Sequence, residues 1–129
     1  MSHPIEGLWR VEIELDGQRT HVTHAYHADG LMQLHAGEHG ASFVWQAMDE
    51  RRFRFRGTRP IEPQAFEFHG WQHAAGEGEV SADGATFQGR ETTDGPHDGR
   101  RVVRKARLHG TRVDVDSPLS QPERSTEVR

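Results

Sequence analysis

The sequence predicts an all-β protein, an antiparallel up-and-down barrel of eight or nine strands. Three observations carry this prediction. Apolar and polar residues alternate over short stretches, Asp-Gly turn signals separate these stretches, and no long stretch free of Gly and Pro has helical periodicity. A strand buries every second side chain, so alternation indicates one buried face. Closure of the sheet removes exposed strand edges and leaves room for one small ligand.

The first half of the chain contains five predicted strands. Asp-Gly pairs at residues 16–17 and 29–30 are hairpin signals. Val44 and Met48 also fit one face of a helix, but Phe43 and Trp45 alternate with polar neighbours, which favours strands. The predicted strands are residues 8–15, 19–27 and 31–36 and two strands within residues 41–55, around a turn at residues 49–50.

In the second half of the chain, apolar and polar residues alternate less regularly. Its prolines and polar residues predict an irregular crossing at 57–63, a polar loop at 92–99 and a mobile C-terminal tail at 117–129. One domain therefore spans residues 1–116. The remaining predicted strands are residues 64–73, 76–80, 85–91 and 101–109, the last with an extension to 115 left open.

Composition narrows the classes of function. The chain has 129 residues, a formal net charge of −4 and no cysteine, which excludes disulfides and thiolate metal sites. It has neither an apolar stretch long enough to cross a membrane nor a signal peptide, so we expect a cytoplasmic protein with no membrane partner. The arginines of residues 51–56 alternate with phenylalanines, which favours a solvated strand face over a nucleic-acid site. The sequence leaves the oligomeric state open, including a homodimer.

Several short motifs, taken in order, resemble those of a known family. Gly7-x-Trp9, then Tyr26 to Gly30, and finally Gly110-Thr111-Arg112 are similar to motifs of bacterial lipocalin-like proteins of the calycin type. The resemblance implies that Trp9 closes one end of the barrel and that Arg112 packs on it, so Gly7, Trp9 and Arg112 have structural roles. It also implies either a binding protein or a small cofactor-free enzyme. A role as an extracellular carrier of ligands is not expected, because the chain lacks a signal peptide and disulfides.

A small apolar or aromatic molecule is the expected ligand. His24 shares an apolar strand face with Val22 and Tyr26, so it is the expected polar anchor of an internal pocket. Tyr26 lies too far along the same strand to be the obvious partner of His24. The predicted lining consists of His24, Tyr26, Phe43, Trp45, Phe55, Phe68 and Trp71. Binding would bury apolar area, with one or two hydrogen bonds fixing the orientation.

The face of residues 64–73 that points inward is left open. Phe66 and Phe68 alternate with Glu67 and His69, and a bulge at Gly70 would place both phenylalanines and Trp71 inside. This last arrangement is favoured.

The alternative function is a cofactor-free cyclase, isomerase or dehydratase. In it His24 or His69 would move a proton and Tyr26 would polarise a carbonyl group. A weaker third hypothesis is heme binding through one histidine. No other cofactor and no metal site is predicted: His21, His24 and His27 alternate between the two sides of a strand, and His35 and His39 belong to a surface loop.

Overall fold

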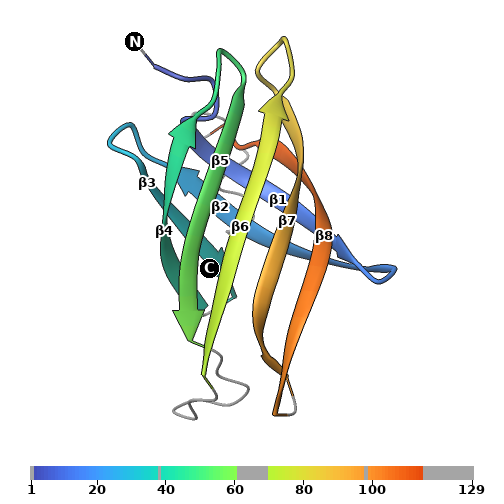
Figure 1. Cartoon of the computed structure of the whole chain (residues 1–129). Coiled ribbons are helices and arrows are strands. Elements are labelled where there is room, and N and C mark those ends of the chain that lie inside the picture. The colour runs from blue at the N-terminus through green and yellow to red at the C-terminus, as the bar shows by residue number, and fades with distance from the viewer. Residues whose placement is uncertain (1, 38, 61–69, 98, 115–129) are drawn as a thin grey trace, which may run out of the picture.

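The protein is a closed antiparallel barrel in which each strand pairs with the next and the last pairs with the first (Figure 1). The computed structural model describes residues 2–37, 39–60, 70–97 and 99–114. Its strands are β1 (Gly7–Leu15), β2 (Gln18–Tyr26), β3 (Leu31–Ala36), β4 (His39–Ala47), β5 (Arg52–Pro60), β6 (Trp71–Val80), β7 (Thr86–His97) and β8 (Arg100–Arg112). None of the described residues forms a helix that could span a membrane.

The predicted fold class is confirmed, but two predicted connections are wrong. Residues 57–60 continue β5 and pair with β6, and residues 92–97 continue β7 and pair with β8. Pro60 is tolerated because it is the last residue of its strand. The chain from 41 to 55 forms parts of two strands, as expected, and not a helix. The predicted tail lies outside the described residues.

One end of the barrel, where β1 begins and β8 ends, is closed by Trp9 and is called the Trp9 end below. The Trp9 side chain is fully buried, and the guanidinium carbon of Arg112 lies 4.3 Å from its ring centroid. Arg112 also donates to the carbonyl oxygens of Gly84, at 2.8 Å, Glu6, at 2.9 Å, and Pro4. Arg112 thus lies over Trp9, as the resemblance implies, and also binds carbonyl groups of two segments outside the strands. A Cβ at Gly7 would lie 2.7 Å from Arg112 Nη1, which explains the glycine.

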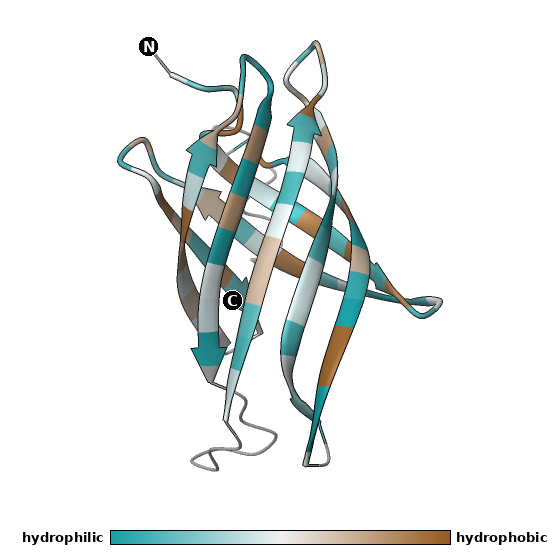
Figure 2. Ribbon diagram, in the orientation of Figure 1, coloured by the Kyte–Doolittle hydropathy of each residue, from teal (hydrophilic) through white to brown (hydrophobic). Residues whose placement is uncertain are grey.

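Aromatic rings fill the interior next to this end. Phe87 packs edge-on against Trp9, with centroids 5.0 Å apart, and Phe53 packs against Phe87 at 5.3 Å and Tyr26 at 5.4 Å. These contacts join β1, β2, β5 and β7, so they cross the interior and do not run along one sheet face. Figure 2 shows the matching alternation of hydrophobic and hydrophilic residues along the strands. Edge-to-face pairs of this kind stabilise a core beyond the area that they bury.

Phenylalanines on the inner face lie over glycines of the neighbouring strand. Phe43 is opposite Gly57, and a Cβ at Gly57 would come within 2.6 Å of its ring. The same relation holds in three other cross-strand pairs: Phe53 with Gly78, Phe55 with Gly76, and Phe87 with Gly110. A glycine weakens a strand, and an aromatic ring laid across it restores the lost contact. The ring and the glycine therefore act as one packing unit.

Candidate functional site

Four of the predicted pocket residues face the barrel interior and are almost inaccessible to solvent. His24, Tyr26, Phe43 and Phe55 are each no more than 2% exposed. Phe55 packs against His24, with ring centroids 5.7 Å apart, and against Phe43 at 6.1 Å. Trp45 is half-buried and lies 6.1 Å from the Tyr26 ring. The structure thus brings these five residues together, and it packs them on one another as part of the core.

Trp71 does not line the interior. Its side chain is 55% exposed at the start of β6, whereas the next residues in alternation, Gln72 and Ala74, face inward. The prediction of an inward Trp71 is therefore wrong. Phe68 and His69 lie outside the described residues, so the predicted roles of these two residues stay predictions.

His24 and Tyr26 form a hydrogen-bonded pair inside the barrel. The distance from His24 Nδ1 to the Tyr26 hydroxyl oxygen is 3.0 Å, so the expectation that Tyr26 is too distant is wrong. Residues two apart on a strand share a face, and both side chains can lean toward each other. Burial lowers the pKa of His24 to about 4 and raises the pKa of Tyr26 well above its ordinary value. Both groups are therefore neutral at pH 7.

Glu91 is a functional candidate that the sequence analysis missed. It lies on the inner face of β7, is 8% exposed, and accepts no hydrogen bond from any residue that the structure describes. Burial raises its pKa, and the positive charge of Arg59 partly opposes this shift. The Glu91 charge adds to the rise in the Tyr26 pKa, so the two groups are electrostatic neighbours. Glu91 lies four residues after Phe87 on the same strand, and this even spacing was the signal that it faces inward.

The inner wall becomes polar at the end opposite Trp9, called the far end below (the lower end of β5 in Figure 1). Arg59 donates from Nε to the Gln72 side-chain oxygen at 2.8 Å. Thr93 and Arg104 are cross-strand partners on the same inner face, and all four residues are half-buried. Solvent therefore reaches this part of the interior, in contrast to the packed rings near Trp9.

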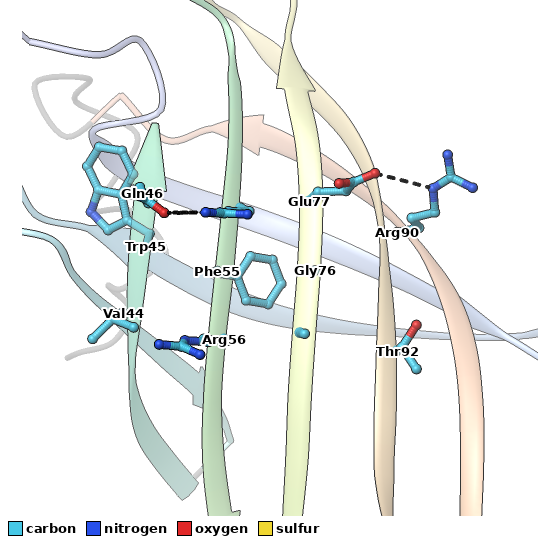
Figure 3. Close-up of a pocket in the computed structure, with 11 residues that line it drawn as sticks. Val44, Trp45, Gln46, Phe55, Arg56, Gly76, Glu77, Arg90 and Thr92 are labelled. Atoms are coloured by element: carbon cyan, nitrogen blue, oxygen red, sulfur yellow. Dashed lines mark hydrogen bonds and ion pairs between the residues drawn. The ribbon is translucent and has the colours of Figure 1, made fainter. Parts of the chain in front are cut away.

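A separate hollow lies on the outer face of β4–β7 (Figure 3). Its volume is about 740 Å³. Gln46 accepts from Arg54 Nε at 3.0 Å and Nη2 at 2.8 Å, and Arg90 Nε lies 3.9 Å from Glu77 Oε2. Its lining is Val44, Trp45, Gln46, Arg54, Phe55, Arg56, Ala75, Gly76, Glu77, Arg90 and Thr92. Phe55 and Gly76 point inward, so they contribute mainly backbone to this hollow.

Within the described residues, no group of three or more His, Cys, Asp or Glu side chains is arranged to hold a metal ion. Comparisons of the chain with protein-family models, with curated proteins and with solved structures find no match. The eight-stranded closed barrel is therefore what the structure establishes. The finer likeness to lipocalin-like proteins rests on the sequence motifs.

Proposed function

We propose that the barrel binds one small molecule with an apolar or aromatic body, which enters through the far end. The observation that carries this proposal is Glu91, a carboxyl group on a buried wall without a hydrogen-bond partner among the described residues. A buried polar group without a partner costs free energy. A ligand that donates a hydrogen bond to Glu91 would remove that cost.

The neighbouring residues define the chemistry of this ligand. Phe43 and Phe55 belong to the apolar core, and an apolar ligand body packed against that core would gain about 25 cal/mol per Å² of apolar area buried. Arg59 and Gln72 supply polar groups nearer the solvent. The expected ligand therefore has an apolar body in the barrel and one or two polar groups among Glu91, Arg59 and Gln72.

A neutral aromatic probe tests this proposal. N-phenyl-1-naphthylamine carries one N–H donor, and its fluorescence rises on transfer to an apolar site. Thr93 and Thr92 offer a matched pair, because Thr93 is a half-buried residue on the inner face and Thr92 is exposed on the outer face. Thr93→Phe would fill the far end and abolish the fluorescence rise, whereas Thr92→Phe would retain it. Circular dichroism of both variants checks that each is folded.

Two results would count against binding inside the barrel. The first is unchanged titration of the probe by the Thr93→Phe variant. The second is loss of the signal in Thr92→Phe alone, which would place the probe on the outer face.

A cofactor-free enzyme that transfers protons is a second candidate, favoured by the hydrogen bond between His24 and Tyr26 and by the electrostatic interaction of Tyr26 with Glu91. A cyclase, isomerase or dehydratase would use such a group to move a proton at a carbonyl substrate. The test is deuterium incorporation next to the carbonyl of an α,β-unsaturated cyclic ketone in D₂O, followed by NMR. Incorporation above the buffer rate that is lost in Tyr26→Phe, with probe binding retained, would support an enzyme. Incorporation at the buffer rate supports a binding protein.

A further inference from the structure

Three residues of one cross-strand row form part of the lining of the hollow on the outer face. Arg56, Ala75 and Thr92 are successive partners on β5, β6 and β7. Neighbouring strands lie about 4.8 Å apart, so Arg56 and Thr92 stand about 10 Å apart on either side of the small alanine. Ala75 lies between them in the lining of the hollow, and its short side chain leaves the space open.

The charges around this space are mostly positive. The adjoining row places Arg54, Glu77 and Arg90 next to one another, so three guanidinium groups meet a single carboxylate. The chain as a whole has a formal charge of −4, so this face has the opposite sign to the molecule. Local positive potential on an acidic protein concentrates anions at that place.

The three arginines differ in their partners. Gln46 orients Arg54 through two hydrogen bonds, and Glu77 lies beside Arg90. Arg56 has no acidic partner among the described residues, so its fork of donors is available to a ligand. A guanidinium fork matches the paired oxygens of a carboxylate or phosphate group.

We propose that the hollow over Ala75 binds a small molecule through an oxyanion group, either phosphate or carboxylate. Arg56 and Arg90 would contact the anion from opposite sides, and the Thr92 hydroxyl would donate a hydrogen bond. This site lies on the opposite face of the sheet from Glu91, so it is independent of the ligand proposed for the barrel interior.

Titration of the ¹⁵N-labelled protein tests the proposal, with inorganic phosphate in one series and benzoate in another. Sodium chloride at matched ionic strength serves as the reference, because screening alone shifts exposed amides. We expect saturable shifts confined to the outer rows of β5, β6 and β7. Saturation by phosphate alone identifies a phosphate-bearing ligand, and saturation by benzoate alone identifies a carboxylate-bearing one. Shifts that never saturate, or that equal those from chloride, overturn the proposal.

Variants locate the site. Arg56→Gln and Arg90→Gln should each weaken binding by about tenfold, the loss expected for one charge-assisted hydrogen bond. Arg10→Gln is the matched control, because Arg10 is exposed on the outer face of β1, outside the hollow. Ala75→Phe fills the space, and an aromatic residue at an exposed strand position is compatible with folding. Equal weakening by Arg10→Gln, or wild-type binding by both Arg56→Gln and Ala75→Phe, overturns the proposal.

Discussion

The buried imidazole of His24 makes the stability of the barrel depend on pH. Burial lowers its pKa from its ordinary value of 6.5 to about 4, so the folded protein binds this proton less tightly than the unfolded chain does. The free energy of unfolding is therefore at its full value above pH 6.5 and decreases as the pH falls toward 4. For a pKa shift of this size the decrease is about 3 kcal/mol. Urea unfolding of the wild type and His24→Gln between pH 7 and 4 measures it. We expect the free-energy gap between them to shrink on acidification, and parallel profiles would contradict the assignment.

The contribution of Glu91 to stability changes with pH in the opposite direction. Burial raises its pKa, so the folded protein holds this proton more tightly, and stability falls as the pH rises from 4.5 through the folded pKa. Glu91→Gln keeps the shape and removes the ionisation. The variant should therefore unfold at a higher temperature than the wild type at pH 7, with the advantage fading toward pH 4. Glu50→Gln, at an exposed turn position, is the control and should change neither value. A Glu91→Gln variant less stable than the wild type at pH 7 would show that the carboxylate has a stabilising partner.

At the scale of the strand, the paired phenylalanines and glycines should be sensitive to a single methyl group. An alanine at position 110 would place its Cβ 2.1 Å from a ring carbon of Phe87, and Trp9 and Phe53 pack against that ring. Overpacking of this kind costs about 1 to 3 kcal/mol. Gly40→Ala is the matched control, because its Cβ would meet the exposed His35 ring, at 3.3 Å, and the Leu34 carbonyl oxygen at an ordinary contact distance of 3.6 Å. Chemical denaturation should show a loss in Gly110→Ala that Gly40→Ala does not share.

The same pairs explain which strands the sequence could predict. Alternation identified β1 to β4 because most of their inner positions are apolar. It failed at the ends of β5 and β7, whose inner positions are Gly57, Arg59, Thr93 and Gly95, because small and polar residues erase the hydrophobic period. The polar far end of the barrel was therefore interpreted as a crossing and a loop.

The sequence predicted only part of the candidate site, for a related reason. Tyr26 and Phe55 were recognised because apolar periodicity placed them inside. Glu91 was missed because a charged residue usually marks the solvent face. Trp71 was placed on the wrong face because the inner face of β6 carries small residues that accommodate rings from β5. Which face of β6 is internal depends on its neighbour, and one strand read alone does not contain that information.

At the scale of the whole molecule, the barrel divides into two halves with different properties. Near the Trp9 end, edge-on rings fill the interior and leave the side chains almost inaccessible. At the far end, the inner wall is polar and half-buried. Dense packing gives one half its stability, whereas the other half retains an unsatisfied carboxyl group. This division fits the binding function proposed above, because a bound ligand would need a rigid floor and an interior wall that offers an unsatisfied polar group.

Arg112 joins segments that are distant in sequence and so bears on the stability of the whole barrel. It is the last residue of β8, it stacks on Trp9 of β1, and it holds carbonyl groups of the N-terminal segment and of the turn between β6 and β7. Lysine keeps the charge but has neither the planar fork nor the flat stacking surface. Arg112→Lys should therefore cost about 2 to 4 kcal/mol, since several charge-assisted hydrogen bonds are lost together.

Equilibrium unfolding measured by tryptophan fluorescence and by circular dichroism tests this expectation, with Arg10→Lys as the control on the outer face of β1. Because Trp9 is fully buried under Arg112, the variant should also show red-shifted emission before unfolding, if the ring gains contact with water. Loss of stability without a red shift would mean that Arg112 acts mainly through the carbonyl groups. Stability equal to that of the wild type would show that the seam between β1 and β8 is held by its backbone ladder alone.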